Sequence, residues 1–202
     1  RKKWKSEGDK REYLVKIIIN SIYGAAAKPV FEQVFSPHGA EDCTAIGRQM
    51  IKYVAEEFDK NGFIVLYGDT DSVYFSAWPV LKDDVESGKL EWTPEKCIAL
   101  YDQVAEQANT TFEKFMAQAF HCPKTRSDVI AAGREIVARS GLYITKKRYA
   151  ALVTDNEGFR TDTDGKPGKV KAMGLDLRRS DTPVFMQKFL SELLLMVLTD
   201  TS

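Results

Sequence analysis

The sequence of 202 residues contains little cysteine and no long apolar stretch. Its three cysteines, Cys43, Cys97 and Cys122, are widely spaced, odd in number and without the spacing of metal ligands. This pattern excludes a disulfide framework and predicts reduced thiols in an intracellular protein. No apolar run approaches the length of a membrane span, and the first residues do not form a signal peptide. We therefore expect no association with a membrane.

Neither sign of charge is in excess, because 29 Lys and Arg residues balance 29 Asp and Glu residues. A highly charged partner would therefore have to be bound by local patches rather than by the field of the whole protein. Basic patches occur at residues 1–5, 146–148, 166–171 and 178–179. Each patch, taken singly, is more typical of a solvated surface. The balance of apolar and charged residues is that of an ordinary globular protein with a sizeable core.

Capping and turn signals divide the sequence into helices and short strands. A helical hairpin is predicted over residues 1–24, with a turn near residues 7–9 and a second arm over residues 10–23. The other predicted elements are a helix over residues 36–62, a strand–turn–strand over residues 63–75, a charged loop over residues 83–91, a helix from Thr93-Pro94, short strands over residues 127–173 with turns at 156–158 and 164–165, and a helix from Thr182-Pro183 to Leu198.

Two aspartates, Asp69 and Asp71, lie two residues apart at the bend that follows the apolar run of residues 63–67. Two like charges this close repel each other unless a cation lies between them. Hard divalent ions such as Mg²⁺ take oxygen ligands, usually one or two carboxylates together with phosphates and water. The pair therefore predicts a metal site that binds phosphates.

Taken alone, the Asp-x-Asp tripeptide is also compatible with an ordinary turn and with two further classes of enzyme. Aspartate is common in turns for backbone reasons, and the same tripeptide occurs in phosphatases and glycosyltransferases. An EF-hand is excluded, because Tyr74 stands where its loop needs Gly and Val80 where it needs Glu. A phosphatase would need a phosphate-binding loop and helix after the acids, whereas residues 73–75 continue as a strand.

Three polar residues of the first hairpin, Lys16, Asn20 and Tyr23, are spaced four and three residues apart and share one helix face. A cation and an amide one turn apart can bind phosphate oxygens, while tyrosine offers a flat ring and a hydroxyl. Gly24 ends the helix and permits the close approach of another group. A solvated polar stripe with Tyr23 at the edge of the core accounts for the same spacing.

Three motifs together resemble those of family B DNA polymerases. Residues 16–24 (KIIINSIYG) resemble the fingers motif of that family, and residues 67–72 (YGDTDS) resemble its second catalytic carboxylate motif. Residues 146–149 (KKRY) are similar to its duplex-binding motif. The motifs occur in the order of the family, and the residues around the third resemble polymerases like those of T-even bacteriophages. Residues 173–175 and 182–183 resemble the crossing from palm to thumb in that group.

The resemblance implies template-directed DNA synthesis by two-metal nucleotidyl transfer, with primer–template DNA and a dNTP as partners and two Mg²⁺ ions as cofactors. It implies that Asp71 bridges both metal ions and that Asp69 supports the site. Lys16 would bind the incoming triphosphate, and Asn20 would help to position it. Tyr23 and Gly24 would contact the minor-groove side of the nascent base pair.

The resemblance also implies further contacts with substrate. In the family an Arg and a Lys four residues apart on the first arm of the fingers bind the triphosphate, and Arg1 and Lys5 have that spacing. Lys147 would contact the minor groove one step behind the nascent pair. The residues expected near the DNA backbone are Lys146, Arg148 and Tyr149, continued by Lys171 and Arg179. Glu135 is expected to pair with its neighbour Arg134 rather than to face the metal ions.

The fold expected from the resemblance is α+β: an antiparallel palm sheet that carries Asp69 and Asp71, backed by two long helices, with a helical fingers hairpin and the start of a helical thumb. Residues 1–24 would be a fingers remnant, residues 25–182 the palm and residues 183–202 the start of a truncated thumb. Both ends look cut. A sliding clamp is a further expected partner, and the expected location is the cytoplasm, with a viral enzyme in a bacterial host.

The first carboxylate motif of the family, an Asp followed by Ser-Leu-Tyr-Pro-like residues, is absent from the sequence. We therefore expect the polypeptide alone to be inactive and to need an upstream polymerase segment that carries this Asp. The alternative is a non-catalytic DNA-binding module on the same scaffold. The presence of both Asp69 and Asp71 counts against that alternative, because binding alone does not require them.

Overall fold

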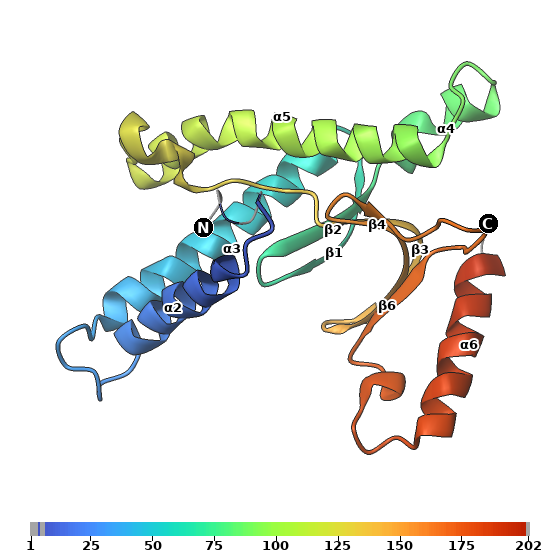
Figure 1. Ribbon diagram of the computed structural model, residues 1–202. Helices are drawn as coiled ribbons and strands as arrows, with labels where there is room; N and C mark the ends of the chain where they lie inside the picture. Colours follow the sequence, from blue (N-terminus) through green and yellow to red (C-terminus); the bar gives the residue numbers. More distant parts are fainter. Residues whose placement is uncertain (1–3, 5–6, 201–202) are drawn as a thin grey trace. The chain divides into compact units, whose positions relative to one another are not determined.

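The computed structural model describes residue 4 and residues 7–200, which form two compact units (Figure 1). The first unit comprises the residues up to 53 together with residues 70–72, and the second comprises residues 54–69 and the chain from residue 73 onward. The helix α3 (Pro37–Lys60) passes from the first unit into the second.

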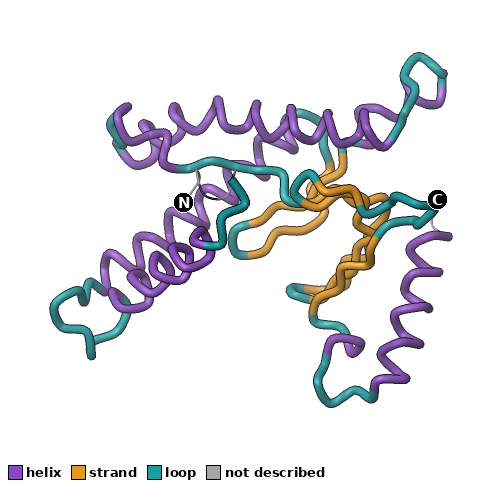
Figure 2. Tube along the Cα trace, viewed as in Figure 1, coloured by secondary structure: helices purple, strands orange, loops and turns teal. Residues whose placement is uncertain are grey.

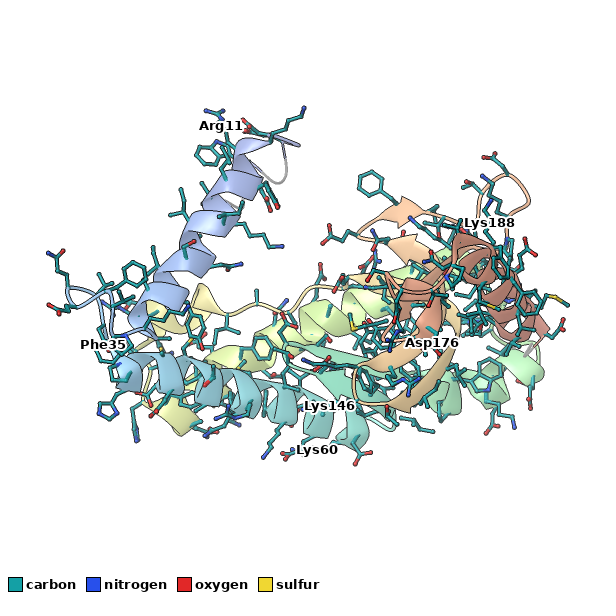
Figure 3. The ribbon with its side chains drawn as sticks, turned by 90° about the horizontal axis from the view of Figure 1, so that it is seen from below. Arg11, Phe35, Lys60, Lys146, Asp176 and Lys188 are labelled. Carbon is teal, nitrogen blue, oxygen red and sulfur yellow. The ribbon has the colours of Figure 1, made fainter. Side chains whose placement is uncertain are left out.

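In the first unit, the helix α2 (Arg11–Ala26) confirms the predicted second arm of the hairpin. The prediction that Gly24 ends this helix is wrong, because the helix continues through Ala25 and Ala26, and alanine favours helix. It follows the predicted turn, in which Asp9 Oδ1 accepts a hydrogen bond from the Arg11 amide at 2.9 Å. The Arg11 guanidinium also bonds to Asp9, and these contacts hold the pKa of Asp9 below its usual value. None of the residues of α2 is buried. Figure 3 shows α2 running away from the start of α3, from the loop with the labelled Phe35 to Arg11.

The predicted starts of the long helices are confirmed, because caps act locally. After Ser36, α3 begins at Pro37, and α5 (Pro94–Phe120) follows Thr93, whose hydroxyl accepts from the Lys96 amide at 3.3 Å. The last helix, α6 (Val184–Asp200), begins directly after Pro183. The predicted charged loop over residues 83–91 is wrong in its first part, since α4 (Trp78–Glu86), with a proline in its first turn, extends through it.

The strands form two sheets, drawn in orange in Figure 2. One is the hairpin of β1 (Ile64–Asp69) and β2 (Ser72–Ser76). The other contains β3 (Ile136–Thr145), β4 (Arg148–Asn156), β5 (Phe159–Arg160) and β6 (Lys169–Met173), and β4 pairs antiparallel with the other three. Short 3₁₀ helices, η1 (Lys124–Val129) and η2 (Asp176–Arg178), complete the elements. The predicted α+β class with antiparallel strands is confirmed, with the strands divided between two sheets.

The core of the second unit is built around β4, in which all residues from Tyr149 to Asp155 are buried. This strand has β3 on one edge and β5 and β6 on the other. The helix α6 lies along the sheet (Figure 1), and its Leu198 packs in one cluster with Ala150 and Leu152 of β4. Burial alternates along β1, by contrast, as in a strand with one solvated face.

Ion pairs connect α5 to the larger sheet. Arg134 Nε lies 2.6 Å from Asp102 of α5, and the same guanidinium bonds to the buried Asp155 at the end of β4. Glu135 instead lies 3.2 Å from Lys171 Nζ. The expected Arg134–Glu135 pair is therefore wrong: Arg134 pairs with two carboxylates and Glu135 with one lysine, because the fold brings these distant charges to them.

The three cysteines are free thiols, and burial raises the pKa of Cys97 to about 11.

Across residue 4 and residues 7–200, no helix is both long enough and apolar enough to span a membrane.

Candidate active site

The acidic bend is a tight hairpin. Because β1 ends at Asp69 and β2 begins at Ser72, Thr70 and Asp71 form the turn, and the predicted strand–turn–strand is confirmed. The Asp69 side chain is half-buried and Asp71 is exposed. Thr70 has a φ of 49°, which is uncommon for a β-branched residue and costs about 1–3 kcal/mol. Such backbone conformations cluster at functional sites.

Four tyrosines hold the acidic hairpin against the β3–β4 hairpin, and we call them the tyrosine cluster. Tyr67 and Tyr74 come from β1 and β2, and Tyr143 and Tyr149 from β3 and β4. Ring centroids lie 5.4 Å apart for Tyr74 and Tyr149 and 5.7 Å apart for Tyr67 and Tyr143. The hydroxyls of Tyr74 and Tyr149 share a hydrogen bond of 3.0 Å. Aromatic pairs at these distances stabilise beyond their area of burial.

The basic turn lies beside the strand that carries Asp69. Lys146 and Lys147 join β3 to β4, and the Lys147 amide donates a 2.6 Å hydrogen bond to the Tyr67 hydroxyl. Tyr67 precedes Asp69 by two residues on β1. The side chains of Lys146, Lys147 and Arg148 are exposed. The second and third sequence motifs, 80 residues apart at this contact, are thus brought together.

The remaining predicted DNA contacts already have partners within the chain. Tyr149 is only 3% exposed and belongs to the tyrosine cluster. Lys171 pairs with Glu135, and Arg179 bonds to both carboxylate oxygens of Asp181 at 2.9 and 2.7 Å. This pair raises the pKa of Arg179 and lowers that of Asp181.

Four of the six predicted nucleotide-binding residues lie among the described residues of the first unit. Lys16, Asn20 and Tyr23 are exposed on α2, and Gly24 is half-buried near its end. Arg1 and Lys5 lie outside the described residues. All six assignments stay predictions.

A divalent ion would find oxygen donors on the acidic hairpin. The described residues contain no group of three or more His, Cys, Asp or Glu side chains that could hold a metal ion. Asp69 and Asp71 nevertheless fit Mg²⁺, which often takes one or two carboxylates and completes its shell with phosphate oxygens and water. The exposure of Asp71 leaves room for such ligands.

The sequence analysis does not predict the tyrosine cluster, although each of its two pairs has a signal in the sequence. In a hairpin whose turn is residues 70 and 71, Tyr67 and Tyr74 are cross-strand partners, and the register of β3 and β4 pairs Tyr143 with Tyr149. Each pair follows from its own hairpin. The packing of one pair on the other has no signal in the sequence.

The cluster predicts a loss of stability at alkaline pH. Burial raises the pKa of Tyr143 to about 12 and also raises the pKa of Tyr74. Unfolded tyrosines titrate at about pH 10, so above that pH the unfolded chain loses protons that the folded chain keeps. The free energy of unfolding should therefore fall between about pH 10 and pH 12. Urea unfolding across this pH range should show a smaller fall in the free energy of unfolding for Tyr143→Phe than for the wild type. Tyr13→Phe changes an exposed residue of α2, and its free energy of unfolding should fall as that of the wild type does. If the free energy of unfolding fell equally with pH in both variants, the prediction would be contradicted.

The chain is similar to DNA polymerases of viruses and archaea. A model of DNA polymerase family B matches residues 2–85. The DNA-directed DNA polymerase of Escherichia phage RB69 is 28% identical over 194 residues, which cover 88% of this chain and 21% of that protein. DNA polymerase 037L of Invertebrate iridescent virus 6 is 31% identical over 180 residues, covering 89% of this chain and 13% of that protein.

An archaeal relative shows the same extent of similarity. DNA polymerase 1 of Pyrococcus abyssi is 29% identical over 168 residues, which cover 80% of this chain and 20% of that protein. The chain thus spans about a fifth or less of the length of these relatives. The alignments extend over most of the 202 residues, and the family model spans the first two motifs, residues 16–24 and 67–72. The chain belongs to the family B DNA polymerases.

Proposed function

We propose that this chain takes part in template-directed DNA synthesis by nucleotidyl transfer, with primer–template DNA and a dNTP as substrates. The observation that carries the proposal is the bond from the Lys147 amide to Tyr67, on the strand that ends at Asp69. It sets a basic turn beside a carboxylate-bearing hairpin. A substrate rich in phosphates suits both, since lysine binds phosphate directly and carboxylates bind it through a cation. Family membership supports the reaction type.

The proposed division of the chain assigns residues 1–24 to the fingers, residues 25–182 to the palm and residues 183–202 to the thumb. The two sheets and α5 would then belong to the palm, where the reaction takes place. In this division α2 would present Lys16 and Asn20 to the triphosphate, with Arg1 and Lys5 as further contacts. Tyr23 and Gly24 would contact the nascent base pair from its minor-groove side.

Asp69 and Asp71 are the proposed metal ligands. Two Mg²⁺ ions, when bound, supply positive charge at the primer hydroxyl and the triphosphate of the nucleotide. Asp71, which is exposed in the turn, would be the main ligand of these ions, and the half-buried Asp69 would support the site. The sequence contains no first carboxylate motif, so an upstream polymerase segment would supply the remaining acidic ligand.

The basic turn is proposed to bind the duplex behind the reaction centre. Lys147 would reach the minor groove, and Lys146 and Arg148 would contact phosphates. Lys171 and Arg179 could join them only by exchanging their carboxylate partners for phosphates. Tyr149 is buried and would support the turn from within the tyrosine cluster.

Removal of the charge at Lys146 should weaken binding of primer–template DNA in a salt-dependent manner. Each phosphate contact contributes about 0.9 to the slope of log affinity against log salt, so Lys146→Ala should lower the slope by about that amount. Fluorescence anisotropy of a labelled primer–template over a series of salt concentrations measures both slopes. Lys188→Ala is the matched control, because it removes an exposed lysine of α6 that is not among the proposed DNA contacts (Figure 3). Equal slopes for both variants would count against the proposed duplex contact.

A further inference from the structure

The chain leaving β6 runs directly against the basic turn. Gly174 follows β6, and a Cβ atom added to it would lie 2.1 Å from the carbonyl oxygen of Lys147 and 3.0 Å from Cγ of Arg148. A contact of 2.1 Å with a backbone atom cannot be relieved by rotation of a side chain. Gly174 also has a φ of 64°, in the left-handed region that favours glycine. Only a residue without a side chain fits here while the turn keeps its place.

The turn itself is held from two sides. Lys147 has a φ of 61°, which is unfavourable for a residue with a side chain and persists only when surrounding contacts fix it. On one side its amide donates to the Tyr67 hydroxyl. On the other side Arg148 Nε donates a 3.2 Å hydrogen bond to the carbonyl oxygen of Gly174. The register that pairs Tyr149 with Met173 places residue 174 opposite Arg148, at the start of β4.

We propose that Gly174 is a positioning residue for primer–template DNA. Its backbone closes over residues 147 and 148 and keeps Lys147 in the conformation in which its amide reaches Tyr67. The direction of the Lys147 side chain is thereby fixed relative to the strand that carries Asp69. Gly174 touches no DNA itself and acts through the turn. The inference rests on the proposed function for its consequence in DNA binding, whereas the fixing of the turn stands on the contacts above.

The test compares two glycines with the same backbone requirement. Gly165, in the loop between β5 and β6, has a φ of 74° and no atom within 4 Å of an added Cβ. Alanine at either position carries a similar conformational cost of about 1–2 kcal/mol. Only alanine at position 174 also collides with Lys147. The difference between the variants therefore isolates the contact with the turn.

Two measurements on the full chain separate positioning from DNA binding. Amide hydrogen exchange by NMR follows the bond from Lys147 to Tyr67, and anisotropy follows the affinity for a labelled primer–template. In Gly174→Ala the Lys147 amide should exchange at least about tenfold faster, and the affinity should fall to that of Lys147→Ala. Gly165→Ala should leave both values as in the wild type. Equal exchange at Lys147 in the two glycine variants would overturn the inference.

A double variant tests whether Gly174 acts through Lys147. Residues in one network give non-additive effects, so Gly174→Ala should weaken DNA binding little further when Lys147 is already alanine. Fully additive losses would overturn the inference, because a general loss of structure would act in both backgrounds. Unchanged affinity in Lys147→Ala would refute the proposed DNA contact, and with it the role of Gly174 in binding. In that case, faster exchange of the Lys147 amide in the single variant Gly174→Ala would still support the fixing of the turn.

A second variant covers the case in which Gly174→Ala does not fold. Arg148→Met removes the hydrogen bond to the Gly174 carbonyl without adding an atom near the backbone of the turn. Faster exchange at Lys147 in this variant supports the inference, and unchanged exchange overturns it.

Discussion

Asparagine in place of Asp71 is expected to abolish the DNA synthesis that we propose for a mixture of this chain with an upstream polymerase segment carrying the first carboxylate motif. The substitution keeps the shape of the side chain but removes the charge that would bind the two cations. Metal ions supply several kcal/mol of transition-state stabilisation, and each 1.36 kcal/mol corresponds to about a tenfold change in rate. We therefore expect a loss of at least about 10³-fold in primer extension with Mg²⁺.

Asp164→Asn is the matched control for this experiment. Asp164 is also an exposed aspartate in a turn, and its replacement changes the net charge by the same amount. Activity of the reconstituted enzyme should be unaffected by it. Robust synthesis by the isolated wild-type chain would contradict the expected need for an upstream carboxylate. Reconstitution of DNA binding without any synthesis would favour the alternative of a non-catalytic module.

The largest loss of stability is expected for Asp155→Ala. The Asp155 side chain is 2% exposed, and it accepts hydrogen bonds from Arg134 and from the Gly158 amide, the latter at 3.0 Å. Its removal leaves a largely buried guanidinium with one partner fewer. Breaking a buried ion pair from one side costs about 3–5 kcal/mol. Urea unfolding followed by circular dichroism should show a fall of about that size in the free energy of unfolding.

Asp102 provides the control, because it binds the same guanidinium from a side chain that is 51% exposed. Exposed ion pairs contribute little, so Asp102→Ala should lower the free energy of unfolding by less than about 1 kcal/mol. If the two substitutions cost the same, burial of the carboxylate is not what gives the Asp155 contact its strength.

Features that depend on adjacent residues could be predicted from the sequence. Pro37, Pro94 and Pro183 each occupy the start of a helix or the residue just before it, because a proline there lacks only an amide that the helix would leave unbonded. The acidic hairpin followed from an apolar run, a polar bend and a second apolar run. A proline in the first turn also signals the start of α4, where it follows Trp78. The charged residues after it are typical of a loop, and the sequence therefore did not predict this helix.

Features that depend on residues distant in the sequence could not be predicted. Arg134 was assigned to its neighbour Glu135, but its partners are 32 and 21 residues away. The bond between Tyr67 and Lys147 spans 80 residues, and periodicity within either hairpin carries no information about it. The candidate site was therefore predicted as separate motifs, and their contact required the fold.

The burial of β4 has a consequence for how substitutions are tolerated along the chain. A strand with one solvated face accepts polar replacements at every second position, and β1 has that alternation. From Tyr149 to Asp155, β4 offers no such position, because neighbours occupy both its edges and both its faces. Sequence variation should thus be least in this strand, directly after the basic turn, even at positions that touch no substrate.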